Sequence, residues 1–194
     1  MVAHVLSRCV EAVGAERVVL LTSTNSTDDP LEAYVRRELD VPVFRGDLVD
    51  VVSRFQACLQ AFPAEWFVRV SGDSPALDPA LIGWMLERWS DELDLLTNVR
   101  RRTFPPGQSV EIVRSATFQC WQSDQLDADE QEHVTQHFYR NPGRFRIQNV
   151  TFDGEPPHRR MVVDTPDDLP VMESILASPP YLFAAGARLE PASA

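Results

Sequence analysis

The sequence contains no lysine, since all 18 of its basic residues are arginine. Without a lysine amine the chain cannot form the Schiff base of a lysine-dependent enzyme, and it cannot supply the lysine of a P-loop. Acidic residues number 29 and give a net charge of −11. A negative surface repels the phosphates of nucleic acids and of anionic lipids, so we expect no nucleic-acid polymer and no membrane among the partners.

Cysteine and long hydrophobic segments are also scarce. The three cysteines, Cys9, Cys58 and Cys120, lie far apart among apolar residues, which argues against a disulfide framework or a Cys-x-x-Cys metal site. No segment approaches the roughly 20 consecutive apolar residues that cross a bilayer, and no charged segment leads into an apolar run at the N-terminus. These features predict a cytoplasmic protein with reduced thiols.

Glycine is sparse as well, because the chain has only eight and all are well separated. No G-x-G-x-x-G sequence follows an apolar run, which excludes a nicotinamide-dependent dehydrogenase with the usual dinucleotide loop.

Apolar runs of strand length alternate with helical patterns along most of the chain. The 44% apolar content and the length of 194 residues suit a single domain with one core. Continuous apolar runs are typical of strands covered on both faces, so we expect an α/β fold with a mostly parallel sheet flanked by helices. Strands are predicted at 17–22, 41–44, 66–70, 93–98, 110–113, 145–152 and 161–163, and helices at 1–13, 30–39, 48–62, 79–89, 128–140 and 166–176. We expect the domain to cover residues 1–177 and residues 178–194 to form a flexible tail.

Two aspartates stand where predicted strands end. Asp73 follows the strand ending at Val70 and lies beside Gly72, whose missing side chain lets a ligand approach the backbone; Asp164 follows the strand ending at Val163. Ligands of open α/β sheets bind beyond the carboxyl ends of the strands, and paired carboxylates there can hold Mg²⁺ against phosphates. The alternative is structural, because an aspartate before a helix is often an N-cap and Gly-Asp is often a turn.

An ordered set of motifs resembles a known family, the CTP-dependent sugar cytidylyltransferases that include the acylneuraminate and CMP-KDO synthetases, in the branch of the spore coat polysaccharide biosynthesis proteins F. The matching segments are Thr22–Asn25 with Asp28–Pro30, Val41–Gly46, Val68–Pro75 with Leu77–Pro79, Glu132–Thr135 and Val163–Leu169.

The resemblance implies the Rossmann-like nucleotidyltransferase fold and a reaction that joins CMP from CTP to a sugar hydroxyl with release of pyrophosphate. It implies that Asp73 and Asp164 hold the catalytic Mg²⁺. We add Arg69 as a catalytic candidate and Arg100 and Arg102 of the cluster 100–102 as substrate contacts, because guanidinium groups match phosphates and acidic sugars. His133 lies in a matching segment, and Glu111 ends the segment 104–111, where the family commonly shows Pro-Arg-Gly-Leu-Asp-Val-Glu; both are also expected to bind substrate.

One family feature is absent from these residues. Family members begin with a strand and a loop, A-R-x-G-S-T-R-L-P-G-K, that cradles the CTP phosphates, whereas Met1–Val5 aligns with the segment that follows this loop. A misassigned start, a shortened chain or a true loss would each explain this, and we expect the chain alone to be inactive. The alternative is a catalytically silent relative that binds a sugar or a partner protein.

The missing strand belongs at the centre of the sheet, between the strands at 17–22 and 66–70. Its absence would leave two apolar strand edges to be covered or paired with another chain, which makes a homodimer an expectation. Pro106 and Ser109 also replace an arginine and an aspartate of the family, so the sugar is not identified.

A zinc site is a weaker alternative. His133 and His137 are spaced i, i+4 on the predicted helix at 128–140, with Glu132 nearby. The metalloprotease pattern requires glutamate directly after the first histidine, but Val134 stands there and no third ligand is evident.

Overall fold

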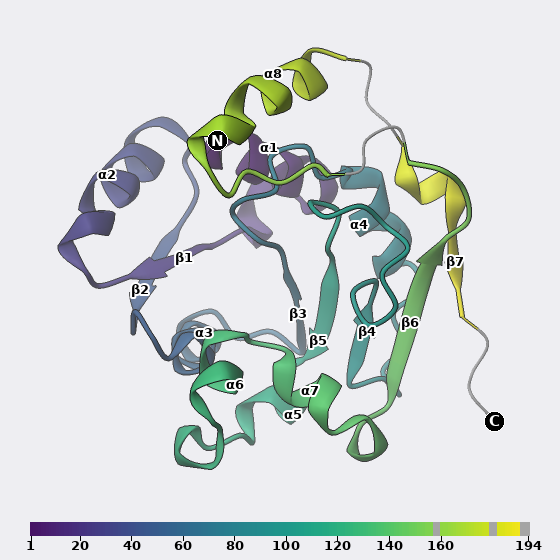
Figure 1. Ribbon diagram of the computed structural model, residues 1–194. Coiled ribbons are helices and arrows are strands. Elements are labelled where there is room, and N and C mark those ends of the chain that lie inside the picture. Colours follow the sequence, from purple (N-terminus) through teal and green to yellow (C-terminus); the bar gives the residue numbers. More distant parts are fainter. Residues whose placement is uncertain (157–159, 179–181, 191–194) are drawn as a thin grey trace.

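The structure is a computed structural model that describes residues 1–156, 160–178 and 182–190 (Figure 1). The strands in this part of the chain are β1 (Leu20–Ser23), β2 (Val43–Gly46), β3 (Trp66–Arg69), β4 (Leu95–Thr97), β5 (Glu111–Arg114), β6 (Ile147–Phe152) and β7 (Ala187–Leu189). The helices are α1 (Val2–Val13), α2 (Asp29–Glu38), α3 (Val51–Ala61), α4 (Pro79–Leu86), α5 (Ser115–Gln119), α6 (Ala128–Glu132), α7 (Gln136–Arg140) and α8 (Leu169–Ala177). None of the helices in these ranges has the length and hydrophobicity required to span a bilayer.

The main sheet has five strands in the order β3-β5-β4-β6-β7. β5 is antiparallel to both β3 and β4, β6 is parallel to β4, and β7 is antiparallel to β6. Thus β3, β4 and β6 run in one direction and place their carboxyl ends at one edge, as the predicted α/β class requires. The reversal of β5 and β7 is not evident from the apolar pattern.

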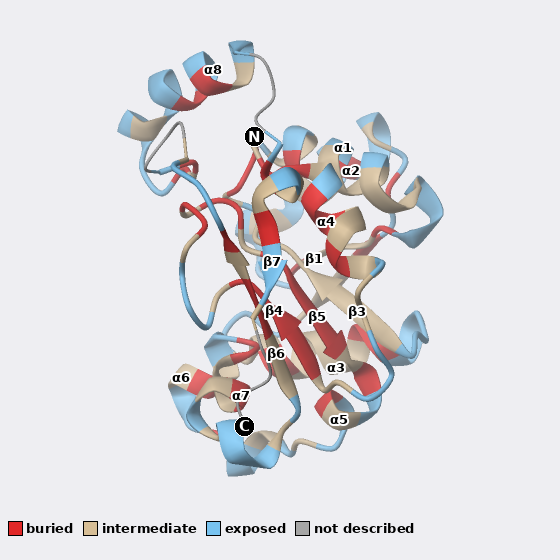
Figure 2. Cartoon of the chain, turned by 90° about the vertical axis from the view of Figure 1, so that its right-hand side faces the viewer, coloured by how far each residue is buried: buried red, intermediate tan, exposed pale blue. Residues whose placement is uncertain are grey.

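Helices cover both faces of this sheet because side chains alternate along the strands. Leu96 of β4 and Ile112 of β5 point into a core that α4 and α8 help to form. Leu95 and Val113, one position away on each strand, point into a second core with α3, α5 and α7. Figure 2 shows the resulting buried centre, with β4 and β5 coloured as buried between the helices.

β1 and β2 form a separate parallel pair, with Leu20 opposite Val43. Within the described residues no ladder joins β1 to β3, so these two strands belong to separate sheets. The residues of β3 are all half-buried, whereas the residues of β4 are fully buried. Each of β1 and β3 thus keeps one edge without a partner strand in this part of the chain, and pairing with a second copy stays a prediction.

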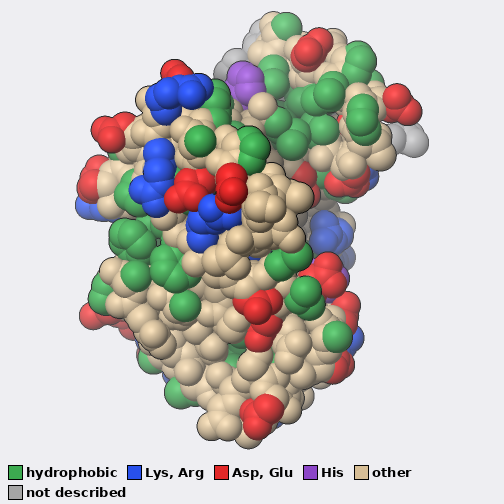
Figure 3. Space-filling view, turned by 90° about the vertical axis from the view of Figure 1, so that its left-hand side faces the viewer, with side chains coloured by type: hydrophobic (Ala, Val, Ile, Leu, Met, Phe, Trp, Pro, Cys, Tyr) green, Lys and Arg blue, Asp and Glu red, His purple; other side chains and the backbone are tan. Residues whose placement is uncertain are grey.

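The surface over α2 carries a group of side chains with charges of both signs (Figure 3). Arg36 pairs with Glu32 one turn earlier, at 2.8 Å. Such exposed i, i+4 pairs stabilise a helix only slightly, so this face is best explained as a solvated helix surface.

The predicted strand at 161–163 is wrong. Met161 and Val163 are buried, but the N–H of Met161 donates to the carbonyl of Pro106 at 2.8 Å and that of Val163 to the carbonyl of Asp73 at 2.9 Å. The segment is extended, yet its hydrogen bonds go to two loops and not to a neighbouring strand. The apolar pattern predicted correctly that this segment is buried, but it could not predict which residues the segment hydrogen-bonds to.

The expected flexible tail is also wrong for residues 182–190. A short 3-10 helix, Phe183–Gly186, is followed by β7, whose Ala187 lies opposite Phe152 of β6. Phe183 is 1% exposed and its ring centroid lies 5.3 Å from that of Phe152. Burial of this aromatic ring orders the segment; residues 179–181 and 191–194 of the predicted tail lie outside the described residues.

Candidate active site

The backbones next to Asp73 and Asp164 are hydrogen-bonded to each other beyond the end of β3. The carbonyl of Asp73 accepts a hydrogen bond from the N–H of Val163 at 2.9 Å, so the backbone that leads into Asp164 is held against the backbone of Asp73. A Cβ atom added to Gly72 would meet no atom within 4 Å. The backbone before Asp73 is therefore open to a ligand, as the sequence indicates.

Neither aspartate serves as a helix cap. The N-cap of α4 is Asp78, whose carboxylate accepts from the N–H of Ala80 at 2.9 Å. The 3-10 helix Pro166–Asp168, which leads into α8, is capped by Thr165 in a reciprocal capping box with Asp168. The structural alternative for Asp164, an N-cap, is thereby removed.

Asp168 fixes the turn that presents Asp164. Its Oδ2 accepts hydrogen bonds from the N–H groups of Thr165 at 2.8 Å and Asp164 at 3.0 Å, and from the Thr165 hydroxyl at 3.1 Å. These donors, led by the Thr165 N–H, hold the pKa of Asp168 below its usual value. The Asp164 side chain is consequently left to interact outside the turn.

Arg160 contacts the carboxylates of Asp164 and Asp168. Its Nη2 donates to Asp164 Oδ2, and its Nε lies 3.9 Å from Asp168 Oδ1. The hydrogen bond to Asp164, together with the charges of Asp164, Asp168 and Asp73, raises the pKa of Arg160. The charge of Arg160 is therefore stabilised by the acidic groups around it.

The donor set fits Mg²⁺ bound together with a nucleotide. Among the described residues no group of three or more His, Cys, Asp or Glu side chains could hold a metal without other ligands. Mg²⁺ typically takes one or two carboxylates and completes its shell with phosphate oxygens and water. Asp73 and Asp164 provide two carboxylates of this kind, and the acidic groups around Arg160 show that positive charge is favoured near Asp164.

Arg69, the third catalytic candidate, ends β3 and forms an ion pair with Glu111. Its Nη1 lies 2.6 Å from Glu111 Oε2, and Glu111 is 1% exposed. The other carboxylate oxygen accepts from the hydroxyl of Tyr139. Both oxygens of Glu111 are thus engaged inside the protein, and the contact of Glu111 with substrate stays a prediction.

The arginine cluster at 100–102 lies in the exposed loop after β4. Arg101 pairs with Glu190 at 3.0 Å, and its N–H donates to Asn149 Oδ1 at 3.3 Å. The side chains of Arg100 and Arg102 have no polar partner within the described ranges. Substrate binding by Arg100 and Arg102 stays a prediction.

The two histidines do not share a helical face. The predicted helix at 128–140 is interrupted, because α6 ends at Glu132 and α7 begins at Gln136, which turns the buried Val134 into the core. His133 is 59% exposed and lies 3.4 Å from Asp129, whereas His137 Nδ1 lies 3.0 Å from Glu130 Oε1. The separate partners argue against zinc, and the substrate contact of His133 stays a prediction.

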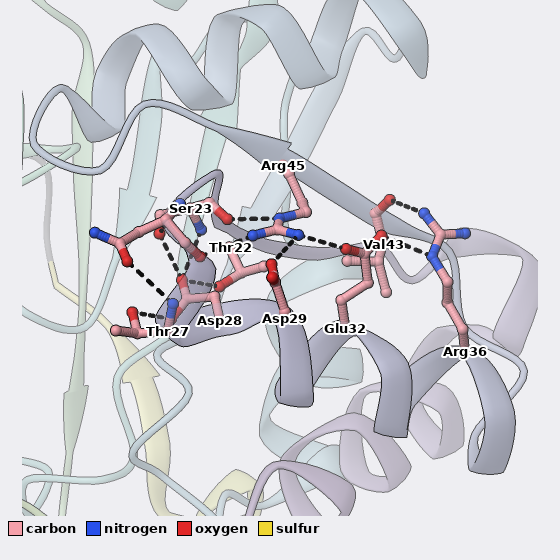
Figure 4. Close-up of polar contacts among 10 residues, drawn as sticks. Thr22, Ser23, Thr27, Asp28, Asp29, Glu32, Arg36, Val43 and Arg45 are labelled. Carbon is pink, nitrogen blue, oxygen red and sulfur yellow. Dashed lines mark hydrogen bonds and ion pairs between the residues drawn. The ribbon is translucent and has the colours of Figure 1, made fainter.

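A polar network at the end of β1 consists of residues that are not among the site residues predicted from the sequence (Figure 4). Asp28 Oδ2 accepts from the hydroxyls of Thr22 at 2.6 Å and Ser23 at 2.7 Å and from the Ser23 N–H at 2.9 Å. These bonds, led by that of Thr22, lower the pKa of Asp28 to about 2. Arg45 of β2 lies 2.7 Å from both Asp29 and Glu32 of α2. The network joins two of the motif segments and holds the loop between β1 and α2.

The α/β sheet flanked by helices is a Rossmann-like fold, and solved structures that share this fold are similar to the chain. The cytidylyltransferase from Leptospira borgpetersenii serovar Hardjo-bovis superposes with a TM-score of 0.81 at 24% identity, covering 95% of this chain and 79% of that chain. The CMP:2-keto-3-deoxy-manno-octonic acid synthetase complexed with CTP gives a TM-score of 0.63 at 16% identity, covering 91% of this chain and 87% of that one.

The chain belongs to the cytidylyltransferase family, whose sequence pattern matches residues 1–177. The spore coat polysaccharide biosynthesis protein SpsF of Bacillus subtilis strain 168 is 29% identical over 156 residues, which make up 79% of this chain and 64% of that relative. The chain thus matches less than two thirds of that relative's length. Membership of the family, predicted from the ordered motifs, is confirmed.

Proposed function

We propose that the protein transfers CMP from CTP to a sugar hydroxyl, with release of pyrophosphate, to activate a sugar for a cell-surface polysaccharide. The observation that supports the proposal is the backbone hydrogen bond from Val163 to Asp73, which brings the segments of Asp73 and Asp164 together, while neither aspartate caps a helix. Family membership supports CTP as the donor, and the name of the Bacillus subtilis relative supports polysaccharide synthesis.

In this reaction the sugar oxygen forms a bond to the α-phosphorus of CTP while the bond from that phosphorus to the oxygen bridging it to the β-phosphate breaks. The hydroxyl proton passes to water, and pyrophosphate leaves with the electron pair. Bound Mg²⁺ supplies neutralisation of the charge on the phosphate oxygens. Asp73 and Asp164 would hold the ion, and Arg69 would contact an anionic group of the substrate.

The metal role of the aspartates is tested with Mn²⁺, a paramagnetic ion that accepts the same oxygen ligands. We expect Mn²⁺, added alone and with CTP, to broaden the backbone amide NMR signals around residues 73 and 164. Asp73→Asn and Asp164→Asn should each weaken Mn²⁺ binding by about tenfold or more, since even a ligand's hydrogen-bond partner contributes that much.

The matched control is Asp124→Asn, an exposed aspartate in the 3-10 helix Ser123–Gln125, which should bind Mn²⁺ as the wild type does. Broadening centred on other residues, or equal affinity in all three variants, would remove the paired aspartates from the site.

The 194-residue chain is proposed to be inactive by itself, because its eight separated glycines form no loop that could cradle a triphosphate. We expect no release of pyrophosphate from CTP, Mg²⁺ and a panel of sugars; turnover would contradict this. The genomic sequence in frame before the codon of Met1 distinguishes the enzyme from the silent relative. A loop motif there supports the enzyme, and a stop codon next to Met1 supports a silent sugar- or partner-binding protein.

A further inference from the structure

Three polar residues line up across the strands beside the candidate site. Arg69 of β3 lies opposite Glu111 of β5, and Glu111 lies opposite Thr97 of β4. Residues that are direct cross-strand partners project from the same face of a sheet. A polar row at this position is unusual, because Thr97 is 0% and Glu111 1% exposed.

Tyr139 of α7 closes this row from the helical layer. Its hydroxyl contacts Glu111 Oε1 and lies 2.7 Å from the Thr97 hydroxyl. A carboxylate only accepts, so Tyr139 donates to Glu111 and accepts from Thr97. The Thr97 oxygen in turn accepts from the N–H of Val99 at 3.0 Å. The direction of each hydrogen bond from the backbone of Val99, just after β4, to Glu111 is therefore fixed.

Because Glu111 is buried, the stability of its charge depends on each hydrogen bond in this network. A carboxylate removed from water needs both a countercharge and hydrogen bonds. Arg69 supplies the charge at 2.6 Å, and Tyr139 binds the oxygen that Arg69 leaves. Burial, followed by the charge of Glu111, raises the pKa of Tyr139, so its hydroxyl keeps its proton and remains a donor at physiological pH.

Arg69 is the member of the row that reaches solvent, because its side chain is 28% exposed. Its Nη1 is engaged by Glu111, and within the described part of the chain no hydrogen bond involves its Nε or Nη2. The residue ends the strand that leads to Asp73. The network thus fixes one side of the guanidinium and leaves its other donors beside the candidate site.

We propose that Tyr139 is a positioning residue that acts through Glu111 to hold the guanidinium of Arg69 toward an oxyanion of the substrate, either a nucleotide phosphate or the carboxylate of an acidic sugar. This role rests on the proposed function for its ligand, but the positioning itself is a property of the protein alone. Tyr139 is separated from Glu111 by 28 positions in the sequence and lies outside every motif used above.

The positioning is tested without ligand, by NMR of the Arg69 guanidinium. Tyr139→Phe keeps the ring and removes the hydroxyl. We expect rotation of the Arg69 guanidinium to become about tenfold faster, the effect of one lost hydrogen bond to a charged group. Glu111→Gln, which retains an acceptor for Tyr139 and removes the charge facing Arg69, should accelerate the rotation at least as much.

The control is Tyr34→Phe on the exposed side of α2, which should leave the Arg69 signals unchanged. A Tyr139→Phe protein that folds with unchanged Arg69 rotation would overturn the proposal. Should Tyr139→Phe fail to fold, Glu111→Gln decides in the same way.

The two sources of the oxyanion are distinguished by titration with CTP and Mg²⁺ in one arm and with glucuronate in the other. Tyr139→Phe should lower the affinity for the same ligand as Arg69→Ala does. The double variant should have an affinity for that ligand no lower than that of Arg69→Ala. Additive losses would show that Tyr139 acts independently of Arg69 and would overturn the proposal. Absence of binding in both arms for the wild type would count against the proposed function, while the rotation measurement still decides the positioning.

Discussion

At the scale of single residues, Asp28 shows how a charge stabilises the loop after β1. It accepts three hydrogen bonds from Thr22 and Ser23, and its pKa falls from 3.8 to about 2 in the folded protein. A depressed pKa means that the stabilisation is complete above the unfolded value and is lost as the pH falls through the folded one. Asp28→Asn should therefore lower the free energy of unfolding by about 1 kcal/mol at pH 7, because the carboxylate is partly solvated.

The pH dependence separates this effect from simple loss of packing. Urea denaturation of the wild type and Asp28→Asn should give a difference that is constant above about pH 4 and shrinks toward pH 2. Asp124→Asn, which changes an exposed carboxylate, should differ little from the wild type throughout. A difference for Asp28→Asn that did not change between pH 7 and pH 3 would show that its charge is not the stabilising feature.

The same scale shows which site residues the sequence reveals. Asp73 and Asp164 could be proposed from the apolar runs before them, but the segment before Asp164 is not a strand, and its place beside Asp73 comes from the hydrogen bond of Val163 to the Asp73 carbonyl. Their role as metal ligands stays a prediction. Glu111 could be found but not interpreted, because its burial and its two partners depend on the pairing of β3 with β5. Tyr139 could not be found, since it reaches Glu111 only after α7 has packed on the sheet.

At the scale of elements, Gly107 couples the loop before β5 to the extended segment before Asp164. Its φ is +95°, and a Cβ atom there would lie 1.9 Å from the carbonyl oxygen of Met161. The N–H of Met161 also donates to Pro106, so the two segments are held together at this point. Gly107→Ala should lower the free energy of unfolding by about 2 kcal/mol or more, because strain and a backbone clash combine. It should also weaken Mn²⁺ binding by displacing Asp164.

Gly83 in α4 provides a control of opposite sign. A Cβ atom there meets nothing within 4 Å, so Gly83→Ala should raise the free energy of unfolding by about 0.5 to 1 kcal/mol through helix propensity. Denaturation midpoints with unchanged m-values measure both effects. Equal stability of Gly107→Ala and the wild type would show that the loop shifts freely, and the coupling to Asp164 would have to be abandoned.

The boundaries of some elements could not be predicted from sequence patterns. The single helix predicted at 128–140 is divided in the structure, where α6 ends at Glu132 and α7 begins at Gln136. The segment 161–163 reads as a strand because Met161 and Val163 are buried, although its hydrogen bonds go to loops. Local patterns thus report which residues are buried, whereas long-range hydrogen bonds decide what those residues form.

At the scale of the whole molecule, the two sheets should differ in local stability. β1 and β2 share a small core with α1 and α2, which includes Leu6, Val35 and Val43. β4 and β5 instead lie between the two larger cores and are buried on both faces. Local opening costs least where few apolar contacts are lost. We therefore expect the amides of the small sheet to exchange with solvent through openings that cost at least about 2 kcal/mol less than those of the main sheet.

Hydrogen exchange followed by NMR tests this directly. The informative amides are those of Leu20 and Thr24, which donate to Pro42 and Gly46 at 2.9 Å, and that of Arg114, which donates to Asp94 at 3.0 Å. Leu20 and Thr24 should exchange at low denaturant through a local opening with weak urea dependence, whereas Arg114 should exchange only through global unfolding. If all three amides converged on one free energy and one urea dependence, β1 and β2 would unfold together with the main sheet. The contacts of α1 with α4, where Val13 packs against the core beneath the main sheet, would then be strong enough to couple the two units.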